Sequence, residues 1–233
     1  MKNKKILIYL LTLPLLLNSL VSFTGTDKIT MKLYSFTEYK TIGSNEIKSR
    51  AGHTFILFSN NTTSTYTIGN YVLSPSNTVS IGLWNKGSGG SSSDGSSSGS
   101  SSGGLEYTGV QYNQECYYYN YVENMVNAVN IEISVSIDKL NKITEKIKEK
   151  NDTYNLIWYN FSTFATELWN IACDKSWYTG WFRKPEAVMK NIKNDYSNYT
   201  YNNSLPKKRT TGHYNKSQNA FHYVEHLWGY RKC

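Results

Sequence analysis

The sequence predicts an α+β domain in which an antiparallel sheet packs against helices. Strand-like patterning dominates between Ile29 and Trp84, and segment 130–137 alternates strictly between apolar and polar residues. Beyond that segment, apolar residues recur at the three- and four-residue spacing of a buried helical face. Strands therefore come first and helices follow, which is the order typical of the α+β class.

Three early segments are predicted strands, residues 51–58, 65–73 and 78–84. Turn-forming residues separate them, first at Asn60–Ser64 and then at Ser74–Asn77. We expect the second segment to return as the hairpin partner of the first. The tyrosine-rich segment from Glu106 to Val122 is predicted to add a further strand.

The first predicted helix follows segment 130–137, with Ser136 or Asp138 as its cap. Its buried face comprises Ile137, Leu140, Ile143 and Ile147, and the helix stops at Asn151–Asp152. Pro185 stands at a favoured first position of a later helix, which continues to Ile192.

The most apolar helix is predicted between these two, where Asn160 and Ser162 are both good caps. Behind them, six residues share one helical face: Phe161, Phe164, Ala165, Leu168, Trp169 and Ala172. A helix N-terminus carries unpaired N–H groups and partial positive charge, and many folds hold an activated nucleophile there.

The chain divides into three predicted parts. Residues 1–24 have the basic start, apolar run and small polar end of a secretory signal peptide, and an uncleaved membrane anchor is the alternative. Residues 28–204 form the domain, with a Gly/Ser-rich insertion at 86–104 that is too polar to bury anything. Residues 205–233 are a basic, aromatic tail, whose last segment we expect to form an amphipathic helix from Ala220 to Trp228.

The composition restricts the possible partners. The formal net charge of +8 falls to about +5 once the three lysines of the signal peptide are removed. A secreted basic protein is attracted to anionic surface polymers, such as those of a cell wall. The alternative is that the positive charge belongs to a solvated, lysine-rich surface that binds no partner. No nucleic-acid motif accompanies the charge, and after signal cleavage no segment is apolar enough to span a membrane.

The cysteines and histidines offer little metal chemistry, so we expect neither a metal nor a cofactor. Cys116, Cys173 and Cys233 fit no zinc spacing, and Cys116 and Cys173 could pair in an oxidising compartment. The segment His222-Tyr-Val-Glu-His226 matches an inverted zinc motif, but a catalytic zinc needs a third protein ligand. Cys233 or His213 could supply it, and a chance match in an aromatic tail is the alternative.

Two motifs together resemble a known family. Ala51-Gly-His-Thr-Phe-Ile56 places His53 on an early strand, and the motif Tyr-Asn-Phe-Ser-Thr-Phe-Ala at 159–165 opens the apolar helix. This pair resembles the circularly permuted papain-like proteins of the NlpC/P60 type, over roughly residues 50 to 201. The resemblance implies a papain-like fold, with a histidine base on a strand and a nucleophilic cysteine at the start of a later helix.

The resemblance also shows what this chain lacks. The position that matches the family's cysteine is Phe161, which has neither a nucleophile nor a titrating group. Ser162 is adjacent, but one step along a helix turns the side chain by about 100°, so Ser162 is either an unusual nucleophile or a cap. Asn70 would orient His53 if the hairpin turns near Asn61–Thr62, and without the cysteine His53 is either a base or an ordinary strand histidine.

These observations lead to three functional hypotheses, and they leave open whether the protein is an enzyme. The first is a secreted, catalytically degenerate papain-like domain that binds cell-wall peptidoglycan or another surface ligand. The second is an active peptide or amide hydrolase that uses Ser162. The third is a structural or adhesive surface protein, for which tyrosine and lysine supply the contacts.

Overall fold

The computed structural model describes residues 28–85, 107–153, 159–178 and 184–226. The predicted signal peptide and Gly/Ser-rich insertion lie outside these residues. Within the described parts, no helix is both long and apolar enough to cross a membrane.

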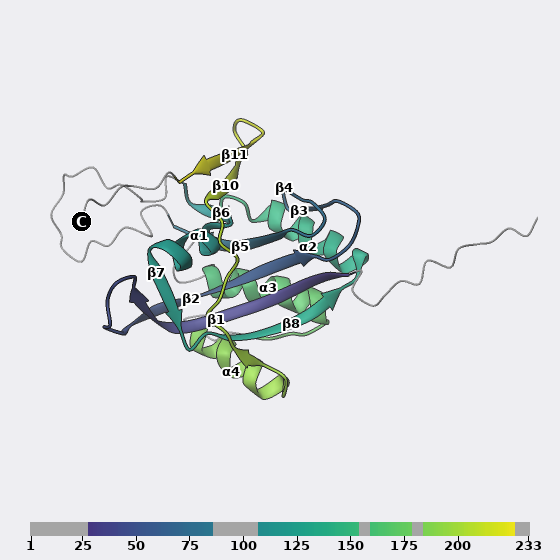
Figure 1. The fold of residues 1–233 in the computed structure, drawn as a ribbon. Coiled ribbons are helices and arrows are strands. Elements are labelled where there is room, and N and C mark those ends of the chain that lie inside the picture. The colour runs from purple at the N-terminus through teal and green to yellow at the C-terminus, as the bar shows by residue number, and fades with distance from the viewer. Residues whose placement is uncertain (1–27, 86–106, 154–158, 179–183, 227–233) are drawn as a thin grey trace, which may run out of the picture.

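Among the described residues, one antiparallel sheet of nine strands dominates. Figure 1 shows the course of this sheet through the molecule. Its strand order is β11-β10-β6-β5-β2-β1-β8-β9, and β7 pairs with β1 beside this path. The strands of this sheet are β1 (Ile29–Thr41), β2 (Lys48–Asn60), β5 (Thr78–Trp84), β6 (Gly109–Tyr112), β7 (Glu123–Val126), β8 (Val129–Val135), β9 (Thr200–Tyr201), β10 (Thr210–Asn215) and β11 (Ala220–Glu225). A separate hairpin consists of β3 (Tyr66–Ile68) and β4 (Tyr71–Leu73).

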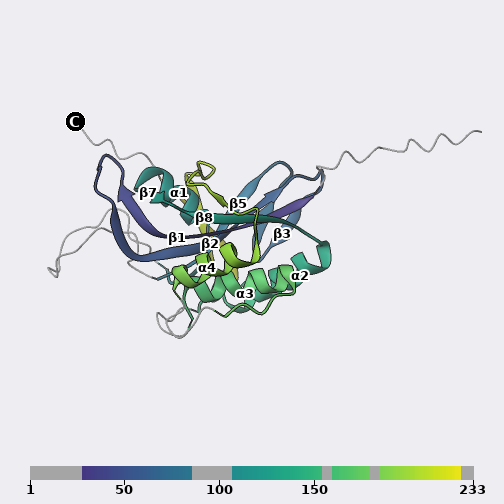
Figure 2. The same cartoon turned by 90° about the horizontal axis from the view of Figure 1, so that it is seen from below.

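Helices cover the two faces of the sheet unequally. The helices are α1 (Gln114–Tyr121), α2 (Ile137–Glu149), α3 (Phe161–Cys173) and α4 (Pro185–Asp195). Figure 2 shows α2, α3 and α4 together on one face, with α1 on the other. The α+β class and the antiparallel sheet packed against helices are therefore confirmed.

Each face of the sheet has its own core. Alternate residues of β2 explain the division, because successive side chains of a strand point to opposite faces. Ile56 and Phe58 pack with the α2, α3 and α4 residues, whereas Phe55 and Leu57 pack with α1. The larger core includes the apolar side of α3, namely Phe164, Ala165, Leu168 and Trp169.

Three expectations about secondary structure are wrong. The segment 65–73 does not pair with β2, because β5 takes that place in the sheet and the segment folds on itself as β3 and β4. Residues 114–121 form helix α1 where a strand was expected. Residues 220–225 form strand β11 where a helix was expected, and β11 pairs along its whole length with β10.

The described part of the predicted tail therefore extends the sheet. In β11, Phe221 packs inward against Tyr112 at 5.1 Å between ring centroids. Tyr223, on the same strand, is exposed. Pairing with β10 determined the conformation of this segment and prevailed over the helical spacing visible in the sequence.

A buried chain of hydroxyl groups ties two helix N-termini to the sheet. Ser35 Oγ on β1 donates to the carbonyl of Pro185 on α4 at 2.9 Å and lies 2.9 Å from Thr54 Oγ1 on β2. Thr54 Oγ1 lies 3.2 Å from Ser162 Oγ on α3. Because each hydroxyl has one hydrogen, Thr54 donates to Ser35 and Ser162 donates to Thr54.

Replacing Ser162 by Ala is expected to lower the free energy of unfolding by about 1 kcal/mol, the usual net value of one buried hydrogen bond. The change removes a donor but leaves Thr54 still donating to Ser35. Urea denaturation measures the loss, with Ser49→Ala, an exposed serine of β2, as the control that should stay near zero. Equal losses in the two variants would contradict the hydroxyl chain.

Candidate functional site

His53 lies where two central strands of the sheet separate. On one side, β2 pairs with β1 through His53, which lies opposite Phe36. On the other side, its pairing with β5 runs only from Ser59↔Thr78 to Ile56↔Ile81, although β5 continues to Trp84. The imidazole is 4 % exposed, so it is buried at this divergence.

Aromatic rings surround the imidazole. The distances between ring centroids are 4.7 Å to Trp84 and 4.8 Å to Phe161. Phe55 and Tyr119 follow at 5.8 and 6.2 Å. The side chain therefore contacts residues of β5 and α1 as well as the first residue of α3.

Glu115, in the first turn of α1, holds the imidazole in place. Its Oε1 lies 3.2 Å from His53 Nε2 and accepts a 2.6 Å hydrogen bond from Trp84 Nε1. Its Oε2 accepts a 2.7 Å bond from Ser80 Oγ. The carboxylate is fully buried, and its three partners and its place at a helix N-terminus compensate for the loss of water.

Gly82 leaves the space that this pair needs. A Cβ atom on Gly82 would lie 1.8 Å from Glu115 Oε1 and 3.2 Å from His53 Nε2. A side chain at this point of β5 would displace the carboxylate from His53.

The arrangement contains two of the three parts of a nucleophile–base–orienter site. A carboxylate oxygen accepts, so Nε2 carries the hydrogen and Nδ1 is the nitrogen left for proton transfer. Glu115 thus stands where an orienting group belongs. The position at the start of α3, where a nucleophile would stand, belongs to Phe161, whose ring contacts the imidazole.

Ser162 does not replace the missing nucleophile. Its hydroxyl is buried and donates to Thr54, on the side of β2 that faces α3. It is not the cap of the helix either, because the Asn160 side chain accepts from the backbone N–H groups of Ser162 and Thr163. Ser162 is therefore part of the hydroxyl chain.

Asn70 does not orient His53. It lies in the turn between β3 and β4, where its backbone N–H donates to the Tyr112 hydroxyl at 3.0 Å. The predicted placement required pairing between β2 and segment 65–73, and that pairing does not form. Glu115 has the orienting contact instead.

Sequence reasoning missed Glu115 because its segment was read as a strand. One signal was present, since Glu115 is the single acidic residue between Glu106 and Glu123 in a stretch dense with tyrosine. An isolated carboxylate among aromatic residues is costly to bury unless it has partners.

The cysteines supply neither a disulfide nor a nucleophile in the described residues. Cys116 and Cys173 are both free, so the pairing that the sequence left open does not form, and Cys233 lies outside the described residues. Cys116 adjoins Glu115, but burial raises the pKa of its thiol to about 12. Because the thiolate is the reactive form, Cys116 is inert at neutral pH.

The histidines of the tail lie on a hairpin. His222 lies opposite His213 with near-parallel rings, and His226 Nε2 is 2.9 Å from Thr211 Oγ1. Among the described residues, no group of three or more His, Cys, Asp or Glu side chains could hold a metal ion. The helical geometry that the inverted zinc motif requires is not formed.

No protein-family model, curated protein or solved structure matches this chain. The resemblance to the permuted papain-like proteins therefore stays a prediction, which rests on the residues and their arrangement.

Replacing Glu115 by Ala is expected to lower the free energy of unfolding by about 3–5 kcal/mol, because three buried donors lose their acceptor. Glu115→Gln should cost less, since its amide oxygen keeps part of the network. Chemical denaturation measures both, and Glu132→Gln is the control. Glu132 forms a partly exposed ion pair with Lys32 at 2.9 Å, so its loss should cost at most about 1 kcal/mol.

A cost for Glu115→Ala no larger than that of the Glu132 control would contradict the role of Glu115 as the buried acceptor of this site.

Proposed function

We propose that this chain is a secreted, non-catalytic domain on a permuted papain-like (NlpC/P60-like) scaffold, which binds cell-wall peptidoglycan or another surface ligand. One observation carries the proposal. The imidazole of His53 lies between the carboxylate of Glu115 and the ring of Phe161, the first residue of α3. This is the order of orienter, base and nucleophile position in a thiol hydrolase, with the sulfur replaced by a phenyl ring.

The surroundings argue against hydrolysis. A thiol hydrolase needs an ionisable nucleophile in reach of the base, and Phe161 provides none. The imidazole itself is almost fully buried, so a substrate cannot reach it while the aromatic rings keep these positions. The alternative of an active hydrolase finds no support in Ser162, whose hydroxyl is directed to Thr54.

The choice of ligand rests on the sequence. A predicted signal peptide directs the chain out of the cytoplasm, and the mature part keeps a net charge of about +5. Wall polymers are commonly anionic, and the family that the chain resembles acts on peptide and amide bonds of peptidoglycan. A retained scaffold without its nucleophile would keep affinity for such material and lose turnover.

Replacing Phe161 by Cys tests the site geometry directly. At a helix N-terminus beside an imidazole, a thiol has a lowered pKa and reacts rapidly at mildly acidic pH. In a Cys173→Ser, Cys233→Ser background, we expect iodoacetamide to alkylate the Phe161→Cys protein at pH 6 at least tenfold faster when His53 is present than in the His53→Ala double variant. Mass spectrometry measures the rates.

Phe164→Cys is the matched control, since its position is on the same helix but fully buried in the larger core, and its alkylation should be slow. Equal alkylation rates with and without His53 would refute the base-and-nucleophile arrangement.

Binding to insoluble peptidoglycan tests the function itself. We expect the wild-type protein to sediment with purified peptidoglycan and to release no new amino termini during prolonged incubation. Release that depends on His53 would instead establish a hydrolase. Failure to sediment with walls of differing composition would overturn the proposed ligand class.

A further inference from the structure

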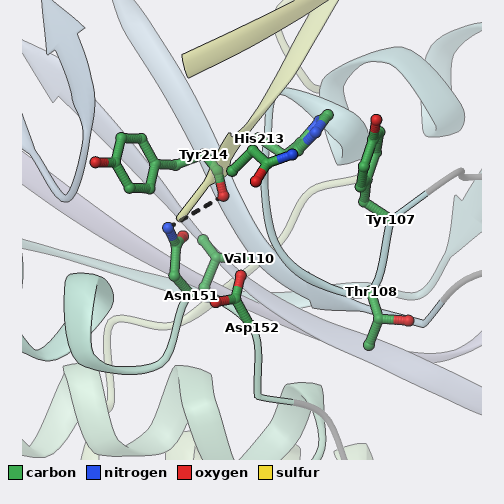
Figure 3. Close-up of a pocket in the computed structure, with 8 residues that line it drawn as sticks. Tyr107, Thr108, Val110, Asn151, Asp152, His213 and Tyr214 are labelled. Atoms are coloured by element: carbon green, nitrogen blue, oxygen red, sulfur yellow. Dashed lines mark hydrogen bonds between the residues drawn. The ribbon is translucent and has the colours of Figure 1, made fainter. Parts of the chain in front are cut away.

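A small hollow lies away from His53, between β6, β10 and the loop after α2. Figure 3 shows its lining, in which the Asn151 side chain points to the backbone carbonyl of Tyr214. Its volume is about 90 Å³, and it is lined by Tyr107, Thr108, Val110, Asn151, Asp152, His213, Tyr214 and Asn215. This is room for roughly three waters or one small polar group.

Asn151, which lines this hollow, has a buried side-chain acceptor without a donor. Its side chain is 2 % exposed, and its Oδ1 has no hydrogen-bond partner. Its Nδ2 donates to the carbonyl of Tyr214 at 3.3 Å, which fixes the direction of the amide, because a reversed amide would set two oxygens against each other. A buried acceptor left unpaired costs about 1–3 kcal/mol, so the site calls for a donor from outside the chain.

The backbone at Asn151 lies close to the backbone at the start of β6. Val110 N donates to the Asn151 carbonyl at 2.9 Å. Gly109, at φ +121°, permits this contact, because a Cβ there would lie 2.0 Å from the same carbonyl oxygen. The loop is therefore anchored to β6, and Asn151 is held rigidly in place.

The other oxygens of the hollow argue against a hard cation. Thr108 Oγ1 donates to Asn85 Oδ1, and Asn215 Oδ1 accepts from Ser217. The Tyr214 carbonyl already accepts a hydrogen bond from Asn151 Nδ2. Calcium requires six to eight oxygen ligands, and these engaged groups cannot supply them. A ligand with N–H donors matches the open acceptor of Asn151 better.

The ammonium group of Lys216, beside Asp152, indicates the kind of donor that suits this hollow. Its Nζ lies 3.3 Å from the carboxylate of Asp152, and both side chains are about half exposed. Such a surface pair contributes at most about 1 kcal/mol, so another ammonium group can displace it at little cost.

We propose that this hollow binds a primary ammonium group, such as a lysine side chain or the free amino terminus of a peptide. Asn151 Oδ1 and the Asp152 carboxylate accept its N–H groups, and Lys216 yields its place. The site is separate from His53, so the inference does not depend on the proposed function.

Titration with methylammonium chloride, followed by ¹H–¹⁵N correlation spectra, tests the proposal. We expect saturable shifts at the amides of Val110 and Tyr214 that equal concentrations of sodium chloride do not produce. Asn151→Leu and Asp152→Asn should each weaken binding at least fivefold, and Lys216→Gln should strengthen it. Tetramethylammonium, which has no N–H donor, should bind at least fivefold more weakly.

Two exposed residues of α2 provide matched controls, and Asn141→Leu and Asp138→Asn should leave the affinity unchanged. Asp152→Asn keeps the test decisive if Asn151→Leu does not fold, because Asp152 is on the surface. The absence of saturable shifts, or equal shifts with sodium, would show that the hollow does not select an ammonium group and would overturn the proposal.

Discussion

The buried carboxylate of Glu115 is the constraint on which the centre of the molecule depends. Glu115 lies on α1 and accepts hydrogen bonds from His53 on β2 and from Ser80 and Trp84 on β5. It therefore joins three elements at the point where β2 and β5 separate. An ionisable group without water requires every one of these partners. This requirement explains why β5 has no side chain at Gly82, where a Cβ would collide with the carboxylate. It also explains the positions of Trp84 and of α1, which bring donor and acceptor together.

The contact between His53 and Glu115 also has a structural role. The His53–Glu115 pair is part of the packing between the two cores, so its removal would leave unpaired donors in the interior. Phe161, by contrast, stands at a helix start, where a ring fills the space next to the imidazole and adds apolar contact. Packing and hydrogen bonding alone therefore account for the positions of His53, Glu115 and Phe161.

The sequence was informative where patterns are local. The alternation at 130–137 and the apolar spacing of α2 and α3 predicted elements that the structure contains, and Asn160 and Ser136 cap their helices as expected. The pairing of β2 was mispredicted because β3 and β4 are as strand-like as β5, and only the whole sheet decides among them. Likewise β11 carries apolar residues at helical spacing, yet pairing with β10 determined its conformation.

The central claim is that Glu115 orients His53 toward Phe161, and long-range ¹H–¹⁵N spectra of the imidazole test it most directly. Because a carboxylate oxygen accepts, Nε2 must carry hydrogen, and we predict a protonated Nε2 together with nuclear Overhauser contacts between the His53 and Phe161 rings. The Nε2 signal should change when Glu115 is replaced by Gln. An unprotonated Nε2 in the wild-type protein, or the absence of contacts between the two rings, would contradict this account.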